Sequence, residues 1–153
     1  MSYMTLKHMA DEVVMEPLVI EEDAIAPIGL DEYAWNAFRG VQVDEAGNIE
    51  MGSYHTAFDA DAVEMFVLML AGRIQSGRLE ITFNDDDGQV FGFFIEKDAA
   101  VMFGKEWTDI WKPLAPKGKA LMRKVISEGI QYYRQQIERM SKLNENIAEE
   151  AAA

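Results

Sequence analysis

The chain of 153 residues carries a net charge of −13 at pH 7, and 49% of its residues are hydrophobic. This length and apolar content exclude wholesale disorder and suffice for one folded domain without a metal ion or a disulfide. The sequence contains no cysteine, which excludes disulfides, thiolate catalysis and cysteine-ligated zinc.

The N-terminal residues and the longest apolar run indicate in which cellular compartment the protein is expected. Residues 1–14 lack a positively charged start followed by an apolar core, so they do not resemble a secretory signal. The longest apolar run, 65–71, is too short to span a bilayer. We therefore expect a cytoplasmic protein, or one in the host cytoplasm if it is viral, with no membrane association.

Acidic side chains concentrate in the first part of the chain. Residues 1–64 contain 14 acidic side chains against Lys7 and Arg39, whereas residues 65–153 are nearly balanced. Within that second part, residues 117–142 contain seven basic side chains and two acidic ones. This layout favours electrostatic pairing, either within the chain or with a partner.

Three short elements are expected before residue 39. Apolar residues recur at helical spacing in 5–15, with Leu6, Met9 and Val13 on one side, which predicts a helix. Residues 17–22 read as a short strand. Residues 30–38 read as a short helix whose Trp35 and Phe38 face inward.

A first hairpin is expected around the loop Glu45–Gly47. It sets Val43 opposite Ile49 and Val41 opposite Met51, so that the apolar residues share one face. Three-residue loops of this kind commonly place glycine last, in the left-handed conformation.

A helix is expected to follow this hairpin. Asp61 and Glu64 form a capping-box-like start, and the apolar residues of 62–74 cover nearly every face. Such a helix is typical of a buried central position. Gly77 is its expected terminator.

A second hairpin is expected around the loop Asp86–Gly88, with Asp85 opposite Gln89. The pairing places Phe83 opposite Phe91. By the same register Ile81 faces Phe93 and Leu79 faces Ile95. One whole face of the hairpin is then apolar, which strand pairing rewards.

A calcium site is the alternative interpretation of the three aspartates in this loop. If Asp85 and Asp87 were the third and fifth ligands of an EF-hand, Phe83 would be the first and Phe94 the twelfth. Neither phenylalanine can bind a cation. The stretch is therefore interpreted as a turn, and no metal site is expected.

Residues 97–112 are expected to form a further helix. The stretch 98–103, DAAVMF, is similar to 61–66, DAVEMF, which indicates a possible repeat of a hairpin–helix unit. The match is short, and such similarity also arises by chance in apolar cores.

The last segment predicts a long helix over 117–147, followed by a frayed tail over 148–153. Its apolar residues alternate at spacings of four and three, which is a heptad-like pattern. The stripe consists of Ile126, Ile130, Tyr133, Ile137, Met140, Asn144 and Ile147. Its first half could pack on the protein's own sheet. Its distal part could associate with a second copy, in a dimer, through Tyr133, Ile137, Met140, Asn144 and Ile147.

No residue pattern indicates catalysis. On a helix His8 would share a side with Asp11 and Glu12, which is too few ligands for a metal site. His55 has no recognisable partner. Nucleophile, phosphate-loop and dinucleotide motifs are missing. We expect no enzyme, no cofactor and no catalytic residue.

Direct nucleic-acid binding is not expected either. The basic residues of 117–142 would need to be uncompensated to hold phosphates, and the chain has a large excess of carboxylates instead. These basic residues are instead expected to lie on a solvated helix face, or on a face that the acidic part of the chain neutralises.

These observations predict an α+β fold, with two hairpins in a mainly antiparallel sheet, a buried central helix and a long C-terminal amphipathic helix in one domain, 1–153. The expected function is an acidic, non-enzymatic protein-binding module, chaperone-like or assembly-related. Size, acidity and the expected helix–hairpin–helix–hairpin–helix order resemble type III secretion chaperones, and no residue role is transferred from that likeness.

Two alternatives remain open. One is a phage or mobile-element inhibitor that mimics nucleic-acid charge and blocks a basic groove on a host protein. The other is a structural subunit of a virion or other assembly. The expected acidic contact surface, suited to a basic protein partner, consists of Glu21, Glu22, Asp23, Asp31, Glu32, Asp44 and Glu45.

Overall fold

The structure is a computed structural model that describes residues 4–52, 58–105 and 109–152. Its elements are β1 (Thr5–Met15), β2 (Leu18–Val19), α1 (Glu32–Trp35), the 3-10 helix η1 (Asn36–Phe38), β3 (Gln42–Val43), β4 (Ile49–Glu50), α2 (Ala60–Arg73), β5 (Ile74–Asp85), β6 (Gly88–Glu96), β7 (Ala99–Phe103), β8 (Ile110–Leu114) and α3 (Gly118–Ala152). The chain divides into two compact units, Met1–Met122 and Arg123–Ala153, which are described separately.

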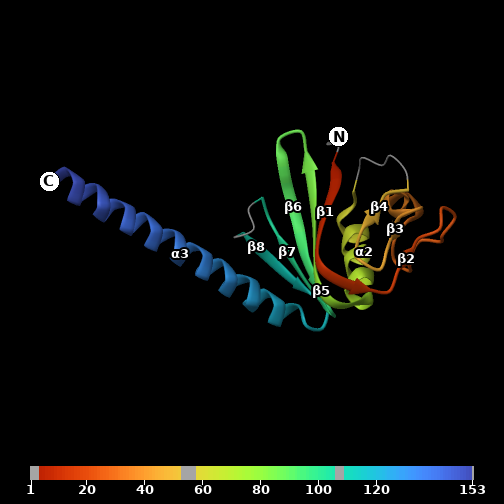
Figure 1. Cartoon of the computed structure of the whole chain (residues 1–153). Helices are drawn as coiled ribbons and strands as arrows, with labels where there is room; N and C mark the ends of the chain where they lie inside the picture. Colours follow the sequence, from red (N-terminus) through yellow and green to blue (C-terminus); the bar gives the residue numbers. More distant parts are fainter. Residues whose placement is uncertain (1–3, 53–57, 106–108, 153) are drawn as a thin grey trace. The chain divides into compact units, whose positions relative to one another are not determined.

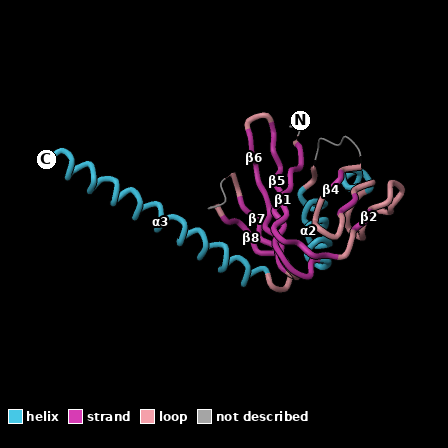
Figure 2. Tube along the Cα trace, viewed as in Figure 1, coloured by secondary structure: helices cyan, strands magenta, loops and turns pink. Residues whose placement is uncertain are grey.

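Two antiparallel sheets form the first unit. The larger has the strand order β1-β5-β6-β7-β8, and the smaller has the order β2-β3-β4 (Figure 1). Figure 2 shows α2 beside these strands, and the strands that it contacts most extensively are β6 and β7. The architecture confirms the α+β prediction, although the two predicted hairpins belong to different sheets.

The main core lies between α2 and the sheets, and aromatic rings hold its centre. Phe38 stacks on Phe66 of α2 with ring centroids 4.6 Å apart. Phe58 meets Phe83 of β5 edge-on at 4.9 Å. Trp35 and Phe38 are both buried, as predicted, and α2 is the buried central helix that its apolar composition indicated.

The opposite face of β6 and β7 is also buried, which the sequence did not indicate. Phe94 stacks on Phe103 with centroids 4.5 Å apart, and Val101 is fully buried beside them in the register. Leu121, near the start of α3, is buried as well. The centre of the larger sheet therefore has apolar residues on both sides.

The second hairpin has the predicted register. Phe83 pairs with Phe91, and the pairs Ile81–Phe93 and Leu79–Ile95 follow. The loop differs by one residue, because Asp85 pairs with Gly88 and a bulge follows Phe83. The Asp85 side chain accepts a 2.8 Å hydrogen bond from the Asp87 amide, which a short loop of this kind favours. The aspartates thus form a turn, as predicted.

The first hairpin also forms with the predicted loop. Val43 pairs with Ile49, and the Asp44 amide donates to the Asn48 carbonyl at 3.0 Å. Gly47, the third loop residue, has φ +83°, the left-handed conformation that glycine adopts without strain. The ladder ends at Gln42–Glu50, so the expected pair Val41–Met51 is not part of it.

The helix predicted over residues 5–15 is wrong, because this segment is strand β1. It pairs with β5, and the pairing is interrupted by a bulge between Asp11 and Val14. The bulge adds a residue, so inward-facing side chains change from a spacing of two to a spacing of three. The resulting irregular spacing of apolar residues is similar to the three- and four-residue spacing of an amphipathic helix. Met9, expected to face inward, is 64% exposed.

The helix predicted over residues 97–112 is also wrong. Residues 98–103 lead into β7, whereas 61–66 lie in α2, so the suggested repeat does not exist. β7 is a central strand with Ala100 and Val101 buried on opposite faces. A continuous apolar run of this length is typical of such strands and of buried helices alike. The element order assumed in the likeness to secretion chaperones therefore does not hold.

The ends of α2 differ from the prediction. Asp59 caps the helix by accepting hydrogen bonds from the amides of Asp61 and Ala62. The helix ends at Arg73 and β5 begins at the next residue, so Gly77 does not terminate it. Gly77 instead lies in β5 opposite the bulge of β1.

The C-terminal helix α3 is longer than predicted, since it continues to Ala152 instead of ending at residue 147. Across the parts of the chain that are described, no helix combines the length and the apolar character that crossing a membrane requires.

Candidate functional site

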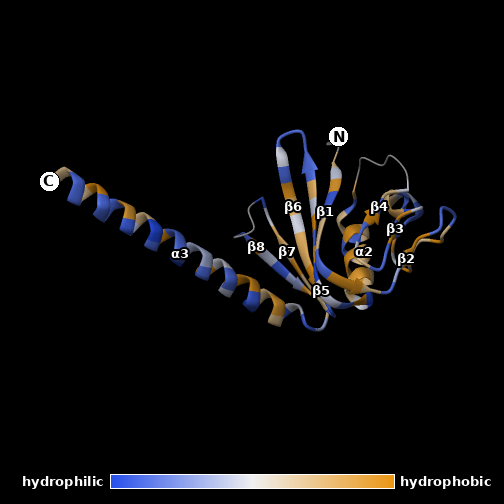
Figure 3. Cartoon of the chain, in the orientation of Figure 1, coloured by the Kyte–Doolittle hydropathy of each residue, from blue (hydrophilic) through white to orange (hydrophobic). Residues whose placement is uncertain are grey.

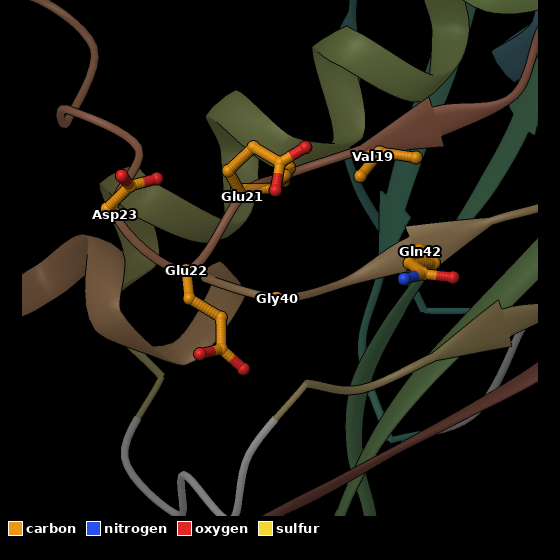
Figure 4. Close-up of a pocket in the computed structure, with 7 residues that line it drawn as sticks. Val19, Glu21, Glu22, Asp23, Gly40 and Gln42 are labelled. Atoms are coloured by element: carbon orange, nitrogen blue, oxygen red, sulfur yellow. The ribbon is translucent and has the colours of Figure 1, made fainter.

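Two surfaces contain the residues expected to make contacts. The first is the edge of the small sheet, where a depression of about 560 Å³ lies beside β2 and β3 (Figure 4). Its lining residues are Val19, Ile20, Glu21, Glu22, Asp23, Gly40 and Gln42. Three of the predicted acidic residues, which are consecutive in the sequence, therefore line this depression directly after β2.

Glu21, Glu22 and Asp23 are exposed, and among the described residues none of their carboxylates has a hydrogen-bond or ion-pair partner. Figure 4 shows their carboxylates directed away from one another. A cation site requires ligands that converge on one point. In the described ranges there is no group of three or more side chains that could hold a metal ion. The arrangement suits contact with separate cationic groups on a partner.

Asp31 and Glu32 have local structural roles. Asp31 caps α1 by accepting a 2.7 Å hydrogen bond from the Ala34 amide. Glu32 pairs with Arg39 and accepts a 3.3 Å hydrogen bond from the Ala26 amide. Arg39 therefore neutralises the charge of Glu32, and the Asp31 carboxylate is engaged in capping α1.

Asp44 and Glu45 line a second depression, of about 460 Å³, which shares Val19 and Gln42 with the first. The Asp44 carboxylate accepts hydrogen bonds from the side chain of Asn48 at 3.0 Å and from its amide at 2.9 Å. These bonds lower the pKa of Asp44 below its usual value, because they favour the charged form. Asp44 therefore organises the turn, and Glu45 is exposed beside it.

The acidic cluster Glu21, Glu22 and Asp23 has apolar neighbours along the chain that sequence reasoning missed. Ile25 is 85% exposed, and Ile28 is fully exposed. Val19, which lines both depressions, is half exposed. The signal available in the sequence was the pair of isoleucines in a segment that follows three acids and contains Pro27 and Gly29.

His8 has a structural contact instead of the helical cluster considered for it. Its Nε2 accepts a 3.3 Å hydrogen bond from the Ile49 amide, which links β1 of the large sheet to β4 of the small one. Asp11 and Glu12 lie further along the same strand, not on a shared helix side. His55 lies outside the described residues.

Glu80, on β5, was also missed by the sequence reasoning. Burial raises its pKa above the usual value, and the nearby Arg78 opposes this shift. Arg78 forms an ion pair with Glu96 at 2.7 Å and lies 5.5 Å above the ring of Phe94. A single carboxyl with a raised pKa does not by itself define an active site.

The second surface is the stripe of α3. Its distal members, Tyr133, Ile137, Met140 and Ile147, are between 49% and 69% exposed. Figure 3 shows apolar residues recurring along the length of this helix. Leu143, which the stripe omitted, is 60% exposed and adjoins Met140. Within the unit 123–153, the side chains of Ile137, Met140 and Ile147 are each more than half exposed, so a large part of their apolar surface is open to contact.

No protein-family model matches the chain, and no curated protein or solved structure matches it either. The geometry of the two surfaces is therefore the basis for any functional assignment.

Proposed function

We propose that this chain is a non-enzymatic protein-binding module, chaperone-like or assembly-related, that acts through contacts made by α3. The observation that carries the proposal is the row of large apolar side chains exposed on this helix. Exposed apolar surface that is contiguous marks interaction sites more often than scattered apolar residues do.

The energetics favour coverage of the stripe by a protein. Burying an isoleucine or methionine side chain is worth about 1.5–3 kcal/mol relative to leaving it exposed. Ile137 and Met140 are 62% and 69% exposed and lie one turn apart, so much of this energy is still available to a partner. Amphipathic helices bind partners through rows of this kind.

The test is affinity capture from native host lysate together with sedimentation of the purified chain. Wild type is compared with Ile137→Glu and Met140→Glu, which place charge on the stripe. Gln131→Glu and Gln135→Glu add the same charge on another face of α3 and serve as controls. Loss of salt-resistant partners with the first pair alone supports the proposal. Equal binding by all four variants contradicts it.

The charge-mimic alternative is favoured by a different observation, the exposed carboxylates of Glu21, Glu22 and Asp23, which have no ion-pair partner among the described residues. A basic partner held by them should dissociate as salt rises, because exposed charges are screened within about 8 Å at physiological ionic strength. Replacing the three acids by Gln, Gln and Asn should abolish its capture. Persistence of the same partner with this variant at low salt would exclude this alternative.

A further inference from the structure

We infer that α3 covers its stripe with α3 of a second copy of this chain, running antiparallel. This inference rests on the proposed function and specifies its partner. It starts from the distribution of charge between the two units. Residues 1–122 contain 22 acidic and 9 basic side chains, whereas residues 123–153 contain five of each. The helical unit is neutral and can meet its own copy without net repulsion, which the first unit cannot.

The heptad positions define a symmetric antiparallel register. In this register Ile130 lies opposite Ile147 of the second copy, and Ile137 lies opposite Met140. The remaining layer sets Asn144 opposite Tyr133, where the amide and the phenol can hydrogen-bond. Each layer occurs twice through the two-fold axis, so the stripe is complementary to itself.

Charge along the helix favours the antiparallel over the parallel orientation. Arg123 lies near the start of α3, and Glu149 and Glu150 lie near its end. The antiparallel register brings Glu150 of one helix to within about a turn of Arg123 of the other, although it also sets Glu149 level with Glu128. A parallel pair would instead align like charges.

The covalent connection of the units adds to this preference. In a parallel pair the two residues 123 would lie about 10 Å apart, which brings two units of charge −13 to the same end. In the antiparallel pair they are separated by about 45 Å along the axis, far more than the Debye length of about 8 Å. In a parallel pair Asn144 would lie opposite Asn144 of the second copy, and such asparagine pairs are known to fix the register of coiled coils. The polar layer therefore does not distinguish the parallel from the antiparallel orientation.

Cysteine cross-linking tests the orientation, since the chain has no cysteine of its own. The full-length double variant Ile130→Cys/Ile147→Cys is oxidised and its linked peptides are mapped. The two positions lie about 25 Å apart on one helix, so a bond between them must join two chains. The inference expects 130–147 links to dominate. Links of 130 to 130 and of 147 to 147 would overturn it in favour of a parallel pair.

A second variant leaves the stripe intact. Glu149→Cys places a spin label away from the interface, and the antiparallel register predicts a label separation of about 30 Å. A separation clearly below this, as two adjacent parallel helices would give, overturns the orientation.

Sedimentation of the wild-type chain separates this inference from the proposed function. A dimer that Ile137→Glu dissociates, and Gln135→Glu does not, supports the inference. A monomer at micromolar concentration overturns it. If the chain is a monomer and Ile137→Glu still abolishes capture of another protein, the proposed function stands while the antiparallel pair does not. If the antiparallel dimer forms and no variant alters the capture of other proteins, the proposed role in binding other proteins is contradicted while the inferred dimer stands.

Discussion

At the scale of single residues, Gly77 shows how a strand pairing depends on the absence of a side chain. It has φ +83°, and a Cβ at this position would lie 2.3 Å from the carbonyl oxygen of Glu12. The bulge in β1 opposite Gly77 includes Glu12, which itself has φ +50°. The close approach of β1 to β5 therefore requires glycine here.

We predict that Gly77→Ala destabilises the protein by about 2 kcal/mol or more, because it combines left-handed backbone strain with a clash against β1. Gly88→Ala is the matched control, since Gly88 also has a positive φ but nothing lies within 4 Å of its Cβ position. Urea unfolding of both variants measures the difference. Equal losses would show that backbone strain alone explains the effect.

Glu80 predicts a pH dependence. Because its pKa is raised in the fold, the native state holds this proton more tightly than the unfolded chain does. Its contribution to stability is therefore present at low pH and lost as the pH rises through the folded pKa. Glu80→Gln should stabilise the protein at pH 7 and have little effect below about pH 4, where an unperturbed glutamate is mostly protonated.

The measurement is urea unfolding of Glu80→Gln and wild type at both pH values. The exposed Glu50, replaced by Gln, serves as the control for removing one negative charge from this acidic chain. A gain for Glu80→Gln at pH 7 no larger than that of the control would contradict the assignment.

At the scale of elements, α2 depends on its first turn. The Asp59 side chain accepts from the Asp61 amide at 3.0 Å and from the Ala62 amide at 3.3 Å. Asp59→Ala should cost about 1 kcal/mol of unfolding free energy, and Asp59→Asn should cost much less because asparagine also caps well. Thermal unfolding by circular dichroism compares the two variants. An equal loss for both would mean that the negative charge matters more than the hydrogen bonds.

Elements differ in how far the sequence predicted them. Both hairpins were found because turn and strands are adjacent in the chain, so Gly47 and the alternation around Phe83 and Phe91 carry the information locally. β1 was missed because its partner, β5, lies far away in the sequence. β7 was missed because a strand buried on both faces has no alternation.

At the scale of the whole molecule, the uneven charge has consequences for stability. The unit 1–122 carries the entire net charge of −13. Like charges oppose the compact state, and salt screens that repulsion. We predict that raising sodium chloride from a low concentration to a physiological one increases the melting temperature by a few degrees.

Differential scanning calorimetry measures this increase. A variant with Glu21, Glu22 and Asp23 replaced by neutral amides should show a smaller increase, because it has less repulsion for salt to screen, and within the described part of the chain these acids form no ion pair. A melting temperature that falls with salt would contradict the prediction and indicate that attractive ion pairs, such as that between Arg78 and Glu96, dominate.

The sequence by itself determined the features that depend on near neighbours or on composition. These are the α+β class, both hairpins, the buried central helix, the inward-facing Trp35 and Phe38, and the heptad stripe. The tertiary structure decided which strands pair across long separations. It also decided that the carboxylates of Asp31, Glu32 and Asp44 accept local hydrogen bonds, whereas those of Glu21, Glu22 and Asp23 accept none from the described residues. The reason is that periodicity along the chain records which side of an element is apolar, whereas the partner that covers that side, or neutralises a charge, is set only when distant segments meet.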